Sequence, residues 1–247
     1  ANNDATEVMS VPRGRVTGGT SAINGQVFMR GLPEDFERWV SWGNLDWNYK
    51  KLIPYFKKLE TDRDFSDDFH GIDGPVPVKR FEESEWQLPQ LAFHRACVAA
   101  GYQSMQDINN PDAFGVGPFA FNNINGIRMS SALTYLSQVR HCLNLTIKAN
   151  CTVHRLIIDR NCVKGVVVES GDERYTVEAD LTILSAGAIG NPKILMLSGI
   201  GPEDHLKDIG VSLTHPLKGV GENPAPVGAF QGVGDICLLY TSDAADE

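Results

Sequence analysis

The sequence lacks the cysteine and histidine spacings that are typical of a disulfide framework or a metal site. Its five cysteines are odd in number and never form a C-x-x-C pair, and its six histidines form no H-E-x-x-H pattern. We therefore expect neither zinc nor disulfides, and a reducing, cytoplasmic compartment is the default. The residues concerned are Cys97, Cys142, Cys151, Cys162, Cys237, His70, His94, His141, His154, His205 and His215.

The sequence also has no excess of basic residues and no long apolar runs. The chain carries 22 lysines and arginines against 31 aspartates and glutamates, a formal net charge of −9. Without a basic excess there is little to displace counterions from phosphates, so nucleic acid is not an expected partner. No apolar run approaches the ~20 residues of a membrane span, and no basic-then-apolar secretion signal begins the chain. The sequence predicts no membrane span, and it makes no prediction about oligomeric state.

The sequence also lacks a glycine-rich dinucleotide-binding motif placed between a strand and a helix. Residues 115–120 nominally fit G-x-G-x-x-A, but they follow a loop, and the residues after them favour a strand over a helix. Residues 199–201 follow a predicted helix, where a C-terminal cap explains the glycines, and residues 219–221 lack a third glycine. All three are interpreted as structural.

What the sequence does have is a segment, residues 11–25, dense in glycine and small hydroxyl side chains. Such a segment allows positive φ angles and a close approach of the backbone to a ligand. Its N–H groups could line up against a diphosphate at the start of a helix. From the residues alone, an ordinary tight turn is an equally good interpretation.

Apolar periodicity and turn residues predict the elements. We expect helices over residues 34–42, 48–60, 88–101 and 130–139, strands over 76–80 and 119–123, and a tight turn at Asn125-Gly126. Short β-type runs follow at 145–149, 153–159, 163–169 and 174–178, then a strand buried on both faces at 181–185. A helix should start near Asn191 with Pro192 in its first turn and Gly199 after its end. This order indicates one α/β domain interrupted by a mixed insertion.

Two long motifs and three short ones resemble the glucose–methanol–choline oxidoreductases. Residues 14–31 (GRVTGGTSAINGQVFMRG) and 187–201 (GAIGNPKILMLSGIG) are similar to the family's two signatures. Between them, residues 34–39, 54–58 and 70–75 follow the family's order, and the likeness runs from about residue 11 to about residue 223. The resemblance implies an α/β fold with α+β character in the insertion. This fold is an incomplete FAD-binding Rossmann-like domain with part of a substrate-binding domain. It would cover residues 1–236, with the inserted segment at about 75–130.

The resemblance also implies FAD as cofactor and a small-molecule alcohol as substrate. No histidine lies in residues 14–31, so a covalent flavin link through that motif is not expected. The residues carried over as cofactor-binding are Gly19, Thr20, Asn24, Gly25, Gln26, Val27, Val153, Ala186 and Gly187. From the residues alone, Val153 could equally be a core valine in a strand.

Members of the family oxidise a CH–OH group by hydride transfer to the flavin, with a catalytic histidine pair for which this sequence offers no match. None of its histidines inherits the role, and we expect the chain to be an inactive fragment of an alcohol- or choline-type dehydrogenase or oxidase. The alternatives are a flavin-containing hydroxynitrile lyase of the same family and a non-catalytic truncated product that is unable to retain FAD. Residues 237–247 resemble translated adapter sequence and are expected to be a non-native tail.

Overall fold

The computed structural model describes residues 11–222, which divide into two compact units, residues 11–145 and 146–222. The predicted division at 1–236, with an insertion at 75–130, stays a prediction, and the predicted tail at 237–247 lies outside the described residues. No helix within residues 11–222 combines the length and apolarity needed to cross a bilayer.

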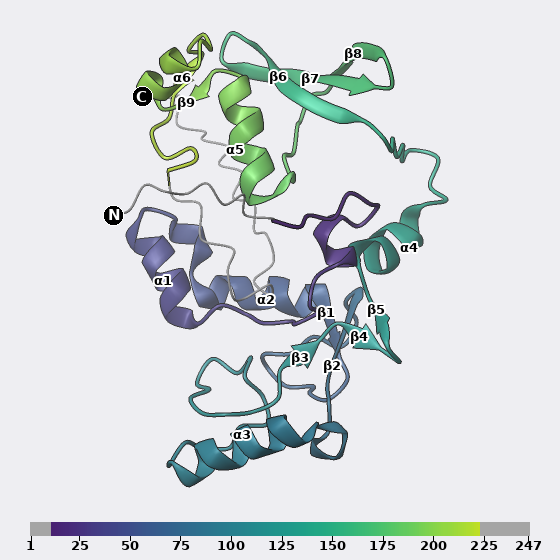
Figure 1. Ribbon diagram of the computed structural model, residues 1–247, viewed down its shortest axis with the longest axis vertical. Helices are drawn as coiled ribbons and strands as arrows, with labels where there is room; N and C mark the ends of the chain where they lie inside the picture. Colours follow the sequence, from purple (N-terminus) through teal and green to yellow (C-terminus); the bar gives the residue numbers. More distant parts are fainter. Residues whose placement is uncertain (1–10, 223–247) are drawn as a thin grey trace. The chain divides into compact units, whose positions relative to one another are not determined.

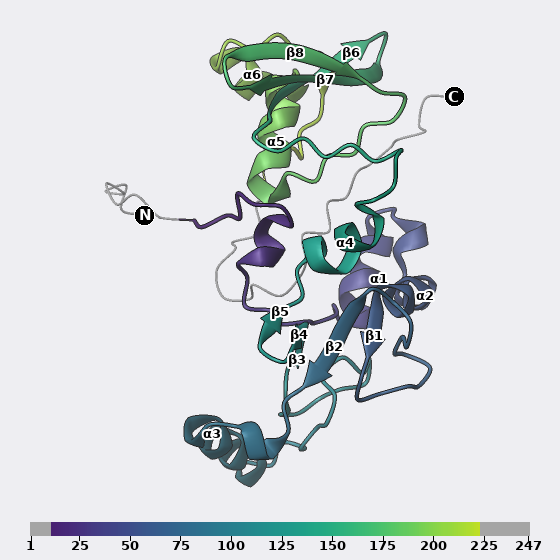
Figure 2. The ribbon, with the colours of Figure 1, turned by 90° about the vertical axis from the view of Figure 1, so that its right-hand side faces the viewer.

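The first unit combines helices with short strands (Figures 1 and 2). Its helices are η1 (Gly19–Ala22), α1 (Pro33–Ser41), η2 (Leu45–Trp47), α2 (Tyr49–Leu59), η3 (Glu83–Glu85), α3 (Leu88–Ala99), η4 (Ala132–Leu136) and α4 (Ser137–Val139). Its strands are β1 (Glu60–Asp62), β2 (Val76–Arg80), β3 (Ala120–Phe121), β4 (Asn123–Ile124) and β5 (Ile127–Arg128).

The three-stranded sheet of this unit buries charges as well as apolar groups. β1 pairs with β2 in parallel, with Glu60 opposite Val76, and β2 pairs with β3 in the antiparallel sense. Side chains alternate between the two faces of a strand. The face of β2 that buries Val76 and Val78 therefore also buries Arg80, while β1 buries Glu60 and Asp62. This alternation builds the ion network described below.

The second unit is an antiparallel meander with a helix packed on it (Figure 1). Its strands are β6 (Thr152–Asp159), β7 (Cys162–Ser170), β8 (Glu173–Glu178), β9 (Ile200–Gly201) and β10 (His215–Pro216), and its helices are α5 (Gly187–Leu197) and α6 (Glu203–Asp208). Its core consists of Leu156 of β6, Ile194 of α5 and Leu184, which precedes α5. The hydroxyl of Ser198 accepts a hydrogen bond from the Leu156 N–H at 2.8 Å, which ties the end of α5 to the sheet.

Most predicted elements are confirmed. α1, α2, α3, β2, β6, β7 and β8 lie within one or two residues of the expected bounds. Gly101 follows α3 with φ 96°, as a C-terminal glycine should. Asn125 and Gly126 take φ angles of 53° and 79° in the turn that joins β4 to β5.

Two predicted strands and the predicted start of one helix are wrong. Residues 145–149 and 181–185 form no strand, because no described strand runs beside either segment to complete its hydrogen bonds. The helix expected at 130–139 is present, as the π-helix η4 followed by the short α4. Helix α5 begins at Gly187, so Pro192 lies inside it and one backbone hydrogen bond of its first half is lost.

Candidate cofactor loop and a buried ion network

The glycine-rich segment folds back on itself at Gly19, the first of the predicted cofactor residues. Gly18 and Gly19 take φ angles of 95° and 55°, and the short η1 follows them. A β-carbon at Gly14 would lie 2.1 Å from the carbonyl oxygen of Gly19, so only glycine allows the two ends of this turn to meet. The segment is a fixed turn followed by four residues of 3₁₀ helix rather than the start of an α-helix.

This turn yields a first prediction. Exchanging Gly14 for alanine forces its β-carbon into the Gly19 carbonyl and must open the turn, at a cost of about 1–3 kcal/mol in the free energy of unfolding. Chemical denaturation of the chain and its Gly14→Ala variant measures the loss. The matched control is Gly219→Ala, where an added β-carbon meets no atom within 4 Å and should change little. Equal stabilities of the two variants would contradict the closed turn.

Six of the predicted cofactor residues lie together on one stretch of the first unit. Gly19 and Thr20 belong to η1, and residues 24–27 follow after three intervening residues. The Asn24 side-chain oxygen accepts a hydrogen bond from the Gln26 N–H at 3.1 Å, and Val27 forms an isolated bridge with Phe121. The stretch is thus anchored to the sheet at Val27. The residues brought together are Gly19, Thr20, Asn24, Gly25, Gln26 and Val27.

The open side of this stretch is at its glycines. A β-carbon added at Gly25 or at Gly19 would meet no atom within 4 Å. Gly25 is exposed and its φ lies outside the left-handed region, so neither packing nor backbone geometry requires a glycine there. The backbone of Gly25 thus faces open space that a ligand could approach closely, which fits a cofactor-binding loop.

The other three predicted residues belong to the second unit. Val153 lies on β6 opposite Val168 of β7, with 36% of its surface exposed. Ala186 and Gly187 form the start of α5, where the Asn191 side-chain oxygen accepts a hydrogen bond from the Ala186 N–H at 2.7 Å. Gly187 takes φ 81°, a conformation that favours glycine. These three residues stay predicted contacts.

A buried ion network in the first unit begins at Arg30, three residues after the cofactor stretch, as we call residues 19–27. Arg30 donates to Glu60 at 2.6 Å. Arg80 donates to both oxygens of Asp62, at 3.0 and 2.9 Å, and to Asp107 at 2.6 Å. The side chains of these five residues are 9% exposed or less. Three carboxylates thus share two guanidinium groups out of reach of water.

His70 supplies the remaining charge of the network. Its Nδ1 lies 2.8 Å from Asp67 and its Nε2 lies 3.3 Å from Asp107, while only 1% of its side chain is exposed. A neutral imidazole has one N–H and could donate to only one of its two carboxylate neighbours, so this geometry favours the doubly protonated ring. Burial works to lower the pKa of His70, but Asp107 and Asp67 outweigh it and raise the pKa above its ordinary value. Burial likewise works to raise the pKa of Asp107, and His70 and Arg80 instead lower it to about 2.

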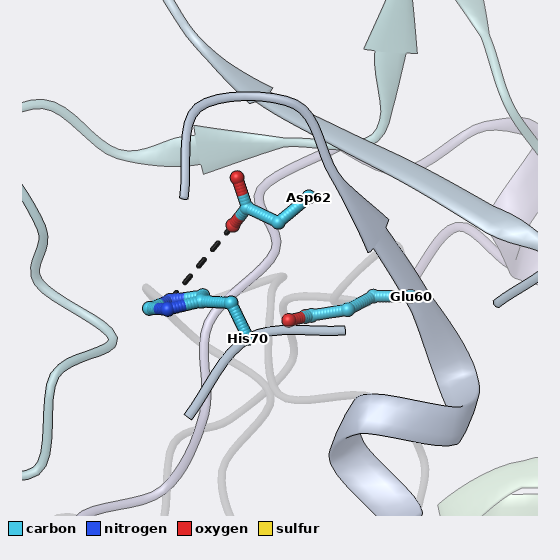
Figure 3. Close-up of side chains that lie close together, drawn as sticks. All are labelled: Glu60, Asp62 and His70. Atoms are coloured by element: carbon cyan, nitrogen blue, oxygen red, sulfur yellow. Dashed lines mark ion pairs between the residues drawn. The ribbon is translucent and has the colours of Figure 1, made fainter. Parts of the chain in front are cut away.

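Figure 3 shows Glu60, Asp62 and His70 converging, an arrangement that could suggest a metal site. One ligand atom of each lies within 4.8 Å of the other two. However, both carboxylates already bind buried guanidinium groups, and a divalent cation would have to enter beside these two positive charges. The three residues are better explained as members of the ion network, and we propose no metal here.

The network is tied to the cofactor stretch through Asn109. Its side-chain oxygen accepts a hydrogen bond from the Arg30 N–H at 3.0 Å, and its Nδ2 donates to the Phe28 carbonyl at 3.0 Å. Its own N–H donates to Asp107 at 3.0 Å. Residues 28–30, which continue directly from the stretch, are therefore held by the same network. Sequence reasoning missed these residues because charged side chains are ordinarily expected at the surface.

Comparison with known proteins identifies the family. The GMC oxidoreductase family model matches residues 2–228, most of the chain. The chain belongs to the GMC oxidoreductase family. The predicted resemblance and the predicted fold are thereby confirmed, the latter also by the solved structures that share it.

Individual members are similar over most of this chain but extend well beyond it. An oxygen-dependent choline dehydrogenase of Photobacterium profundum is 38% identical over 86% of this chain and 38% of the relative. The crystal structure of pyridoxine 4-oxidase from Mesorbium loti has a TM-score of 0.78 at 34% identity, covering 83% of this chain and 40% of that one. An FAD-dependent oxidoreductase from Chaetomium thermophilum has a TM-score of 0.77 at 26% identity, covering 84% and 38%. The chain thus spans about two-fifths of the length of these GMC relatives.

Proposed function

We propose that this chain supplies part of the FAD-binding region of a GMC oxidoreductase that oxidises CH–OH groups of small alcohols. The observation that carries the proposal is the open backbone face at Gly19 and Gly25, within the motif that resembles the family's first signature. A cofactor that must lie against the backbone needs such a face, because any larger side chain would fill it. FAD, when bound, would accept the hydride from the alcohol carbon.

The residues of the cofactor stretch would bind and orient this group. Gly19 and Thr20 would lie against its diphosphate, while residues 24–27 would line the flavin side. The resemblance adds Val153, Ala186 and Gly187 of the second unit as further contacts. No catalytic residue is assigned within the chain, and the acid–base groups of the reaction would belong to the remainder of a longer protein.

The names of two relatives support the substrate class. Choline and pyridoxine each carry a CH–OH group, and the proteins concerned are called a choline dehydrogenase and a pyridoxine 4-oxidase. An alcohol oxidation therefore accounts for the names better than the hydroxynitrile lyase alternative, in which no net oxidation occurs. For the chain by itself we expect FAD binding without alcohol oxidation.

An FAD titration tests the proposal. The purified chain is mixed with FAD, freed of excess by gel filtration and examined for the flavin absorption band, and weaker binding is followed by quenching of FAD fluorescence. We expect binding by the wild-type chain and at least tenfold weaker binding by Gly25→Ala, whose added methyl group fills the open face.

The matched control for this titration is again Gly219→Ala. An added β-carbon meets no atom within 4 Å at either glycine, and neither has a φ in the left-handed region, so both variants should fold as the wild type does. If the wild-type chain bound no FAD, the proposal would fail for this chain. Equal affinities of both variants and the wild type would remove the cofactor role of the stretch around Gly25.

A further inference from the structure

A short hairpin about a hundred residues away in the sequence holds the cofactor stretch. It consists of β4, the Asn125-Gly126 turn and β5, and Arg128 is the last residue of β5. Arg128 donates from Nε to the Asn24 carbonyl and from Nη1 to the Ala22 carbonyl, both at 3.0 Å. Two donors of one rigid planar group thus fix two peptide planes immediately before Gly25.

The same hairpin region holds the next residue, which is strained. Gln26 takes φ 65°, a left-handed conformation that is uncommon for a residue other than glycine. Its carbonyl accepts a hydrogen bond from the Asn122 N–H at 2.9 Å, and its side-chain oxygen accepts one from the Asn123 amide. A strained backbone persists where its surroundings impose it, and such positions concentrate at ligand sites.

The guanidinium group of Arg128 contacts carbonyl groups rather than acids in the described part of the chain. Among the residues that the structure describes, no carboxylate lies within ion-pair distance of its guanidinium group. Arg128 is half-buried and donates its hydrogen bonds to two backbone carbonyls. Its positive charge therefore lies beside the stretch that we propose binds an anionic diphosphate. One side chain would thus both hold the loop and attract the anion.

We propose that Arg128 is a positioning residue for the cofactor. Through the carbonyls of Ala22 and Asn24 it holds residues 22–26 in the conformation that leaves Gly25 open. This inference rests on the proposed function. Its mechanical half, that Arg128 holds the loop conformation, concerns only the hairpin and the stretch. Arg128 need not touch the reacting atoms, because it acts through the loop.

The mechanical half is tested without FAD. Amide hydrogen exchange of residues 19–27, followed by mass spectrometry, is compared between the wild-type chain, Arg128→Lys and Arg128→Ala. We expect at least tenfold faster exchange in Arg128→Ala, and a partial effect in Arg128→Lys, because an ammonium group cannot form the two-pronged contact. Arg174→Ala, which removes an exposed arginine of the second unit, should leave exchange in this stretch unchanged.

The cofactor half is tested by FAD affinity and chemical rescue. Arg128→Ala should bind FAD at least tenfold more weakly, with its melting temperature within a few degrees of the wild type. A few millimolar guanidinium chloride, far below denaturing concentrations, should restore part of the affinity to Arg128→Ala and none to Arg128→Lys. A role limited to general folding would give no such rescue.

The outcomes separate the two proposals. Unchanged exchange in Arg128→Ala would show that Arg128 does not hold residues 22–26, whether or not FAD binds. Faster exchange with unchanged FAD affinity overturns the positioning role and leaves the proposed function intact. A wild-type chain that binds no FAD overturns the positioning role together with the proposed function. Should Arg128→Ala fail to fold, Arg128→Lys decides, because it keeps the charge and the aliphatic stem.

Discussion

Replacing Arg80 with methionine is expected to lower the free energy of unfolding by about 3–5 kcal/mol, the usual cost of removing one partner from a buried ion pair. Its guanidinium group binds Asp62 and Asp107, whose side chains are 0% and 9% exposed. Methionine fills a similar volume but leaves both carboxylates without this cation. They would have to take up protons or water inside the unit, and either process costs stability.

Urea denaturation of the wild-type chain and the variant measures this loss. Arg80→Lys should recover only part of it, because one ammonium group cannot reach both carboxylates in the geometry of the guanidinium fork. The matched control is Arg174→Met, which breaks an exposed ion pair with Glu169 and should cost about 0–1 kcal/mol. A loss of less than about 1 kcal/mol for Arg80→Met would show that water reaches the network and that its charges are screened.

The predictions that succeeded concern elements whose signals are local. Helix α2 was predicted from an apolar stripe of Leu52, Tyr55, Phe56 and Leu59, of which Tyr55 is 68% exposed in the structure. The structure adds a cap, because the Asn48 side chain accepts a hydrogen bond from the Lys51 N–H at 3.0 Å. The Asn125-Gly126 turn needs two positive φ angles, which these residue types tolerate. Such features depend on neighbours within four residues and can be derived from sequence alone.

The predictions that failed depend on distant partners. Residues 181–185 have the composition of a buried strand, yet Leu181 and Ile183 are 67% and 68% exposed and no described strand pairs with them. An apolar run indicates that burial would be favourable, but it does not show whether a neighbouring strand is present to pair with it. The burial of Glu60 and Asp62 was not predicted at all, because the alternation of a three-residue strand buries two acids that composition alone would place at the surface.

The candidate site divides in the same way. The glycines of residues 14–25 could be found in the sequence, because close approach of the backbone requires that residue type. Arg128 could not, since its contacts to Asn24 and Ala22 span 104 and 106 positions of the chain. Nothing in the local sequence of β5 distinguishes an arginine that holds a loop from one that faces solvent.

The second large effect concerns pH and comes from His70. Its ring faces acids from three segments: Asp67 at 2.8 Å, Asp107 at 3.3 Å, and Asp62 of β1 at 3.8 Å. Glu60, with an oxygen within 4.8 Å of a ring nitrogen, the guanidinium group of Arg80 and the ring of Phe65, at 5.3 Å between centroids, also lie near the ring. Although burial opposes it, the neighbouring acids raise the pKa of His70 in the folded chain above its ordinary value.

A histidine with a raised folded pKa stabilises the protein fully below its unfolded pKa of about 6.5 and loses that contribution as the pH rises through the folded pKa. Each unit of difference between the two pKa values contributes about 1.4 kcal/mol. We therefore expect the free energy of unfolding to fall as the pH rises from about 6.5 into the alkaline range.

The measurement is a series of urea denaturations across this pH range, with the titration of His70 followed by NMR and assigned through His70→Asn. The variant should be less stable at pH 6 and should lack the fall, because asparagine takes no proton. His154→Asn, which alters a partly exposed pair with Glu169, should retain the fall. A His70 ring that is neutral at pH 6.5 in the folded chain would contradict the assignment. The three buried carboxylates would then have to share two cations, and one of them would carry the missing proton.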